Sequence, residues 1–151
     1  MVVDPANAPA AARDLVIEAS ARVTTASAIP IVVDARSDSP SGDHVTVRWR
    51  PLPPTKPVRL GVSSARLTRS GATGTITVNT ERPLEPNFSS RTSTGATLMH
   101  EIGHAVGLGH SSDPADVMFS RVQPGPLEWG PGDRAALAAA GAARGCASKR
   151  S

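Results

Sequence analysis

The spacing of hydrophobic positions predicts a first helix over residues 9–26. Apolar residues recur there at steps of three and four, which places them on one helical face: Leu15, Val16, Ala19, Val23 and Ala26. Pro9 can open the helix, because a proline in the first turn gives up no helical hydrogen bond. We therefore expect an amphipathic helix that packs on a flat surface.

Two further helices are predicted from their end signals. Ser93 is a suitable N-cap for a helix that runs to Gly107, where the glycine can end it. The last helix is predicted over residues 131–140, with signals at both ends: Gly130, Pro131, Asp133 and Gly141. The proline opens this helix, the aspartate stands in the first turn, where the helix dipole favours an anion, and the final glycine closes it.

Four stretches between the first two helices predict strands. Residues 29–35 (IPIVVDA) form an almost wholly apolar run that suits a buried strand. Residues 44–50 alternate cleanly, with apolar side chains on one side only: Val45, Val47 and Trp49. Residues 58–67 suit a strand at the sheet margin, and residues 75–80 (TITVNT) are rich in β-branched residues. Together these elements indicate an α+β fold, with helices packed on a sheet of about four to five strands.

Composition and charge narrow the classes of protein further. A chain of 151 residues fits one compact domain, so we expect a single domain over residues 1–151. The 16 Lys and Arg residues outnumber the 13 acidic ones, but they are spread along the chain, which argues against nucleic-acid binding. No run of about 18 apolar residues could span a membrane. Because the chain has no Tyr, a mechanism that needs a tyrosine hydroxyl is excluded.

The stretch HEIGHAVGLGH, residues 100–110, carries the spacing of a zinc site. His100 and His104 are four residues apart on a predicted helix, so both imidazoles project from one face and can reach a single ion. Gly107 ends the helix and lets the chain turn back, which brings His110 to the same ion. Three neutral imidazoles leave the fourth position of a tetrahedral zinc ion open, as in catalytic rather than structural sites.

Glu101 follows the first of these histidines directly, and this position favours a general base. It lies beside the open coordination position, where it can take a proton from water activated by the zinc ion and pass it to the leaving amine. The zinc ion lowers the pKa of that water and polarises the scissile carbonyl. The residue pattern therefore predicts a hydrolase with one catalytic Zn²⁺.

The longer stretch HEIGHAVGLGHSSDPADVMF resembles the matrixin family of metzincin peptidases. Ser111 follows the zinc motif, as is typical of matrixins, and Val117-Met118-Phe119 resembles their Met-turn. The resemblance implies a metzincin-like fold with a twisted mixed sheet, an active-site helix, a Met-turn and a C-terminal helix. It also implies a zinc endopeptidase, with His100, His104 and His110 as ligands and Glu101 as the base.

Further expectations rest on the same resemblance. Met118 would form the hydrophobic floor under the three imidazoles, although a lone methionine is more often core filling. An extended polypeptide substrate would add along the edge strand, residues 58–67. Residues 119–124 would line the specificity pocket. Matrixins are secreted or extracellular, and we expect the same location here, with a monomer and no membrane or nucleic-acid partner.

Several positions depart from the family pattern. The second, structural zinc of many matrixins needs further histidines, and only His44 remains, which we expect to be an exposed strand-end residue. No calcium site can be assigned, because the acids of the likeliest loop lack a recognisable ligand spacing: Asp34, Asp38 and Asp43.

The two ends of the chain carry further expectations. The first strand of the fold is reduced to residues 1–3, and residues 142–151 form a tail with a single cysteine, Cys146. The first residues lack the basic and apolar regions of a secretory signal, and no prosegment with a zinc-blocking cysteine precedes the domain. Cys146 is either an ordinary tail thiol or the partner of a cysteine in an upstream segment. We hypothesise that the chain is a trimmed catalytic domain or one whose natural start lies upstream, and such a segment could hold an export signal and this cysteine.

Three hypotheses of function follow from the sequence. The first is a zinc-dependent endopeptidase that hydrolyses extended polypeptides. The second is a catalytically weak zinc-containing module that binds peptides along its edge strand, which the presence of Glu101 disfavours, since binding alone needs no base. The third, a structural zinc domain, is disfavoured because three protein ligands leave the ion open. The natural substrate and the cleavage preference are not encoded in these motifs.

Overall fold

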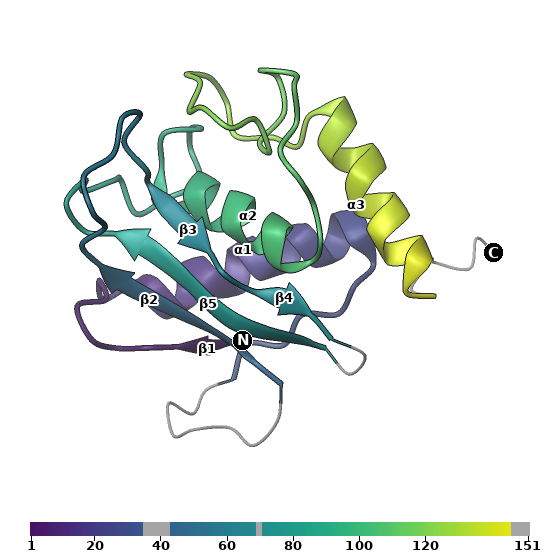
Figure 1. Ribbon diagram of the computed structural model, residues 1–151, viewed down its shortest axis with the longest axis horizontal. Helices are drawn as coiled ribbons and strands as arrows, with labels where there is room; N and C mark the ends of the chain where they lie inside the picture. Colours follow the sequence, from purple (N-terminus) through teal and green to yellow (C-terminus); the bar gives the residue numbers. More distant parts are fainter. Residues whose placement is uncertain (35–42, 69–70, 146–151) are drawn as a thin grey trace.

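The sheet of this protein is an open, mixed sheet, and the fold is α+β, as the hydrophobic pattern predicts. The computed structural model describes residues 1–34, 43–68 and 71–145, and within them three helices and five strands are found (Figure 1). The prediction of about four to five strands with helices packed on them is confirmed.

The strands are arranged so that β3 forms one margin of the sheet. Their order is β1-β2-β5-β3, and β4 pairs with β5 beyond the end of β3. The bounds are Val2–Val3 for β1, Val45–Arg50 for β2, Gly61–Ser63 for β3, Arg66–Leu67 for β4 and Ala72–Asn79 for β5. The first two strands and β5 run parallel, and β3 and β4 run antiparallel to β5. The free edge of β3 is therefore available to an extended chain.

Strand β2 follows its predicted alternation. Val45, Val47 and Trp49 are buried, whereas Thr46 and Arg48 on the other face are half-buried. Its parallel partner β5 contributes Ile76 and Val78 to the same core. The helices pack on this apolar face of the sheet and shield it from water.

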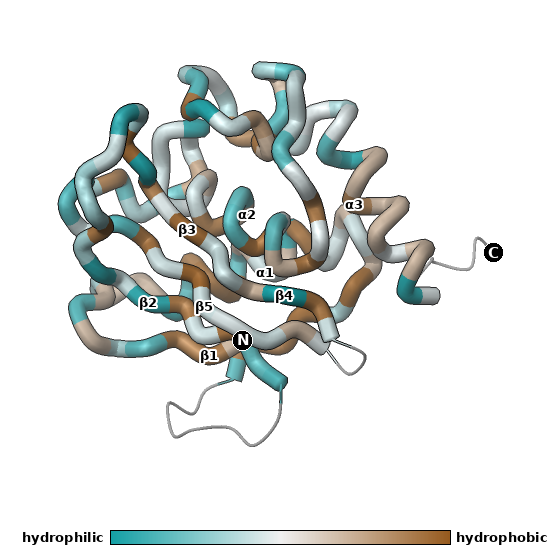
Figure 2. Tube along the Cα trace, viewed as in Figure 1, coloured by the Kyte–Doolittle hydropathy of each residue, from teal (hydrophilic) through white to brown (hydrophobic). Residues whose placement is uncertain are grey.

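Three helices complete the molecule: α1 spans Ala12–Ser27, α2 spans Thr94–Ala105 and α3 spans Pro131–Ala143. In Figure 1, α1 and α2 lie side by side behind and above the sheet, and α3 packs beside α1 at the right. Hydrophobic residues colour stretches of the strands and of α2, whereas the outer loops are mainly hydrophilic (Figure 2). Among the described residues, no helix has the length and apolar character needed to cross a bilayer.

The predicted buried strand at residues 29–35 is wrong over its described part. Residues 29–34 have no strand pairing and are tied to the N-terminus by hydrogen bonds, including one of 2.8 Å from the Asp34 amide to the Met1 carbonyl. Ile29 is buried, but Val32 is 77% exposed. Pro30 removes one amide donor, and the short β1 leaves little strand to pair with, so an apolar run here produces an extended coil. Ala35 lies outside the described residues.

Helix ends differ from prediction at two places. Helix α1 begins at Ala12, because Pro9 stands in a preceding turn whose carbonyl accepts from the Ala12 amide. Helix α3 passes through Gly141 and ends at Ala143. A Cβ at Gly141 would lie 1.7 Å from the Ser27 carbonyl oxygen, so this glycine permits the close approach of α3 to the end of α1 and is not a helix end.

Strand bounds also shift. The predicted edge strand over residues 58–67 is divided into β3 and β4, and Val58 at its start is 44% exposed. Strand β5 begins at Ala72, three residues before the predicted start at Thr75. The Gly74 amide donates to the His44 carbonyl, and Gly74 has a φ of 135°, which glycine tolerates. The strand therefore continues through a glycine, a residue type that often marks a turn.

Candidate active site

Helix α2 packs one face in the core and carries two histidines on the other. Ser93 caps it as predicted, with its side chain accepting from the Ala96 amide. Leu98 and Ile102 are fully buried, so one face of the helix is fixed in the core. His100 and His104 stand on the opposite, partly exposed face.

A Schellman motif ends α2 and reverses the chain. The Leu108 amide donates to the Gly103 carbonyl at 3.0 Å, and the Gly107 amide donates to the His104 carbonyl at 2.9 Å. Gly107 has a φ of 104°, a conformation that residues with a Cβ rarely adopt. The chain therefore doubles back over the helix and places His110 beside the two helical histidines.

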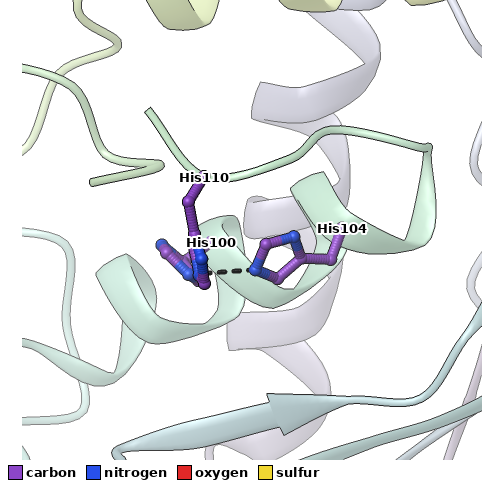
Figure 3. Close-up of side chains that lie close together, drawn as sticks. All are labelled: His100, His104 and His110. Atoms are coloured by element: carbon purple, nitrogen blue, oxygen red, sulfur yellow. Dashed lines mark hydrogen bonds between the residues drawn. The ribbon is translucent and has the colours of Figure 1, made fainter. Parts of the chain in front are cut away.

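The three imidazoles converge on one point (Figure 3). Their candidate ligand atoms all lie within 4.8 Å of one another, and the Nε2 atoms of His100 and His104 are 3.1 Å apart. Two nitrogen ligands of a tetrahedral zinc ion lie about 3.3 Å apart, given Zn–N distances of about 2.0–2.1 Å. The spacing of the helical pair thus fits a shared ion.

The Nδ1 atoms of the two helical histidines are already engaged. Nδ1 of His100 lies 2.8 Å from the Val117 carbonyl, and Nδ1 of His104 lies 2.8 Å from the Leu108 carbonyl. Since a carbonyl only accepts, each Nδ1 carries the hydrogen and each Nε2 is left with a lone pair. This is the orientation that a metal ligand needs.

Burial lowers the pKa of two of the three imidazoles. Burial lowers the pKa of His100 to about 4, with a smaller lowering from the two neighbouring histidines, against the raising effect of its bond to Val117. Burial, followed by the neighbouring His104, also lowers the pKa of His110. Neutral imidazole is the form that binds a metal ion, so the donor set fits zinc.

Glu101 is buried beside this group, with only 5% of its surface exposed. Burial raises the pKa of its carboxyl to about 7, although the Ser63 amide and the Arg59 guanidinium act in the opposite direction. A Cβ at Gly61 would lie 2.8 Å from Oε1 of Glu101, so β3 passes directly over the carboxyl. A proton acceptor that is poised near neutrality therefore lies between the histidines and the edge strand.

Met118 packs against helix α2, and the expected floor under the three imidazoles stays a prediction. Met118 is 2% exposed, and its sulfur would be 2.6 Å from a Cβ at Gly103, the residue before His104. We call residues 110–130 the Met-turn segment. Its turn is held by Asp133 of α3, whose carboxylate accepts from the amides of Val117, Met118 and Gly130 at 2.6, 3.0 and 2.9 Å.

Asp116 is a structural residue of the site that sequence reasoning missed. Its Oδ2 accepts from the Ser111 hydroxyl at 2.6 Å, and its Oδ1 accepts from the Gly132 amide at 3.1 Å. A Cβ at Gly130 or Gly132 would lie 2.0 or 2.1 Å from these oxygens, so only glycines accommodate the carboxylate. In the sequence, the two glycines on either side of Pro131 could have indicated a close contact, but no short-range pattern connects them with Asp116.

A cleft of about 930 Å³ runs over the histidines and Glu101. Strand β3 and the residues before it line one side, and residues 119–123 of the Met-turn segment line the other. Of the predicted specificity segment 119–124, only Pro124 is absent from the lining. In Figure 1, α2 lies between β3 and the segment that passes over the top of the molecule.

The remaining candidate positions stand apart from this cleft. His44 directly precedes β2 and is half-buried, and it does not join the group of three histidines. Within the described ranges, that group is the one set of three or more potential ligands close enough for a metal ion. Asp38 and Cys146 lie outside the described residues, so the structure does not bear on expectations that involve them.

Comparison with known proteins identifies the class. The matrixin family model matches residues 38–133, which is well over half of the chain and includes the three histidines, Glu101 and Met118. This chain belongs to the matrixin family, which comprises zinc-dependent metalloproteases of the hydrolase class.

A curated relative supports the same family. The probable matrix metalloproteinase 095L of Invertebrate iridescent virus 3 is 46% identical over 41 residues. That alignment covers 27% of this chain and 11% of the viral protein, so the chain spans only a small part of this relative.

Proposed function

We propose that this protein is a zinc-dependent endopeptidase that cleaves extended polypeptides. One observation carries the proposal: three imidazoles converge beside a buried carboxyl, in a cleft bordered by a free strand edge, and Nε2 is available on the two helical ones. Membership in the matrixin family supports the same activity.

In this proposal His100, His104 and His110 hold one zinc ion. When bound, zinc supplies a Lewis acid that lowers the pKa of a water molecule and polarises a peptide carbonyl. The carbonyls of Val117 and Leu108 fix the rings of the two helical histidines by accepting from Nδ1. These bonds hold the ligand face in place before the ion arrives, which limits the cost of ordering it.

Glu101 is the proposed general base. An Oε atom takes the proton of the attacking water and later gives it to the nitrogen of the leaving amine. A carboxyl whose pKa is raised to about 7 can both accept and release a proton near neutral pH. Burial under β3 also limits access of bulk water to this carboxyl.

The substrate backbone would add to the free edge of β3. This strand pairs with β5 on one side only, and Gly61, Val62 and Ser63 all line the cleft. An added chain would form main-chain hydrogen bonds there, while its side chains alternate into and out of the cleft. The proposal includes a monomeric enzyme that acts outside the cell, as is general for matrixins.

A zinc-containing peptide-binding module is the second candidate, since the same edge strand would serve it. It gives no reason for Glu101 to be buried beside the imidazoles, where ionisation is made costly. An inactive module would bind peptides equally well with glutamine at this position.

The substitution Glu101→Gln separates the two candidates. Glutamine keeps the shape of the side chain but cannot accept the proton, so kcat should fall by about 10²–10⁴-fold while zinc content stays at one ion per chain. The exposed Glu128→Gln is the matched control and should leave kcat unchanged. Cleavage of a fluorogenic peptide library and metal analysis of the same samples give the result. Unchanged cleavage by E101Q would refute Glu101 as the base, and no zinc-dependent cleavage by the wild type would favour the binding module.

A further inference from the structure

The cleft carries more positive than negative side chains along its walls. Five of its lining residues are basic: Lys56, Arg59, Arg82, Arg91 and Arg121. They come from three separate segments: the chain before β3, the loop between β5 and α2, and the Met-turn segment. The charge is therefore a property of the assembled cleft and is not visible as a run in the sequence.

The acidic side chains of the cleft do not neutralise these cations. The two acidic lining residues are Glu101 and Asp116, and both are buried. The carboxylate of Asp116 is bonded to the Ser111 hydroxyl and the Gly132 amide, and only 5% of Glu101 is exposed. Glu101 interacts with Arg59, and neither acid lies at the surface beside Arg82 or Arg121.

Four of the five cations remain available to a ligand. Arg91 is engaged, since its guanidinium donates to the carbonyls of Pro114, Ala115 and Pro126. The other four side chains have no ion pair within the part of the chain that the structure describes; its two ion pairs are Arg22–Glu18 and Arg50–Asp4. Lys56, Arg59, Arg82 and Arg121 are all exposed.

Apolar side chains stand between these cations on both walls. Val58 on the β3 side is 44% exposed and Val122 on the Met-turn side is 50% exposed, and both line the cleft. Exposed valines at two sides of a cleft are suited to apolar side chains of a bound peptide. Cations around them are suited to carboxylates on neighbouring residues.

We propose that the cleft selects acidic polypeptides, with Asp or Glu residues flanking an apolar residue near the scissile bond, and that Arg82 and Arg121 determine this specificity. This inference rests on the proposed function and adds a substrate class to it. An ordinary basic surface would place its cations without regard to the site. Here they come from three segments and line one cleft, where low-dielectric walls strengthen their field.

The test compares three fluorogenic peptides that share an apolar centre and carry flanking Glu, Gln or Lys residues. The zinc-loaded protein should cleave the Glu peptide with a kcat/KM about tenfold above that of the Lys peptide at low ionic strength, and the preference should shrink at high salt. The variant R82E/R121E should lose or reverse the preference for the Glu peptide over the Lys peptide.

The variant R13E/R134E is the matched control. It makes the same change of charge at two exposed arginines outside the cleft lining, and it should keep the preference. Equal cleavage of the three peptides by the wild type would overturn the inference and leave the proposed function intact. An equal loss of preference in both variants would also overturn it, because net charge alone would then explain the selectivity. Absence of cleavage of all three peptides would instead refute the proposed peptidase activity, and the inference with it.

Discussion

Helix α2 and the Met-turn segment both contribute to the candidate site, but they are held in place by different forces. The helix has regular backbone hydrogen bonds and a fully buried apolar face that includes Leu98 and Ile102. The segment after it has no helix or named strand. Met118 and Leu127 bury their side chains in the core, but apart from a single bridge between Ser111 and Phe119 its backbone is fixed by polar contacts. Those contacts come from Asp116, Asp133 and Arg91.

This difference between apolar and polar contacts separates what stabilises the fold from what sets the geometry of the site. Apolar burial is non-directional, so it anchors α2 strongly without specifying fine orientation. Hydrogen bonds that backbone amides donate to a buried carboxylate are directional, so they fix the position of each amide in an irregular backbone. We therefore expect changes in α2 to alter mainly stability, and changes at the polar contacts to alter mainly the metal site.

The largest effect on stability is expected for Leu98→Ala. The side chain is fully buried on the face of α2 opposite the histidines, so its loss should lower the free energy of unfolding of the metal-free protein by about 3 kcal/mol. Zinc affinity of the folded protein should change by less than about threefold, because no hydrogen bond to a histidine involves this side chain. Urea unfolding with a chelator and zinc titration provide the two measurements. Ile17→Ala, at a position 38% exposed, should cost below about 1 kcal/mol. A large change in zinc affinity in L98A would contradict the expectation that apolar contacts of α2 control stability and not the metal site.

Asp133→Asn should have the next largest effect. Asparagine can accept from the Met118 amide, but its NH₂ group faces the amides of Val117 and Gly130, so two bonds are lost and stability should fall by about 2 kcal/mol. Zinc binding should also weaken, since the Val117 carbonyl orients His100. The exposed Asp14→Asn should cost at most about 0.5 kcal/mol through the helix dipole.

The stability difference between wild type and D133N should depend on pH. Burial raises the pKa of Asp133, and the nearby Asp116 adds to this, against the lowering effect of the three amides. A carboxyl with a raised folded pKa contributes stability that is complete below its unfolded pKa and is lost as pH rises through the folded value. The advantage of the wild type should therefore be fully present below pH 3.8 and should decline as pH rises above that value. A difference that grows with pH in urea unfolding would show that the three amides outweigh burial.

The same comparison explains what the sequence predicts and what it does not. Helix α2, its Ser93 cap, the Gly107 reversal and the convergence of the histidines depend on short-range spacing, so they could be inferred from local pattern. The contact of Gly61 with Glu101, forty positions apart, depends on sheet order, which the alternation of residues 58–67 does not specify.

Two errors have the same origin. Residues 29–35 have the composition of a buried strand, but β1 is too short to pair with them. Gly141 has the position of a helix end, but the approach of Ser27 makes it a packing residue inside α3. In both cases a tertiary contact overrides a local signal, and no window along the chain contains it.

The smallest effect is expected for Ser111→Ala, which removes one hydroxyl from the polar contacts of the Met-turn segment. The hydroxyl donates to Asp116 and accepts from the Asp113 amide, while the Ser111 amide donates to the Met118 carbonyl and follows His110 directly. Its removal frees the third histidine to move, and zinc affinity should fall by about tenfold, the lower end of effects from groups that orient metal ligands. Unfolding of the metal-free protein should change by less than about 1 kcal/mol, since the group is half-buried. The neighbouring exposed Ser112→Ala is the control, and competition with a chromophoric chelator measures affinity. If S111A and S112A bind zinc equally well, His110 is held by the backbone alone, and the carboxylate of Asp116 serves only to join the Met-turn segment to α3.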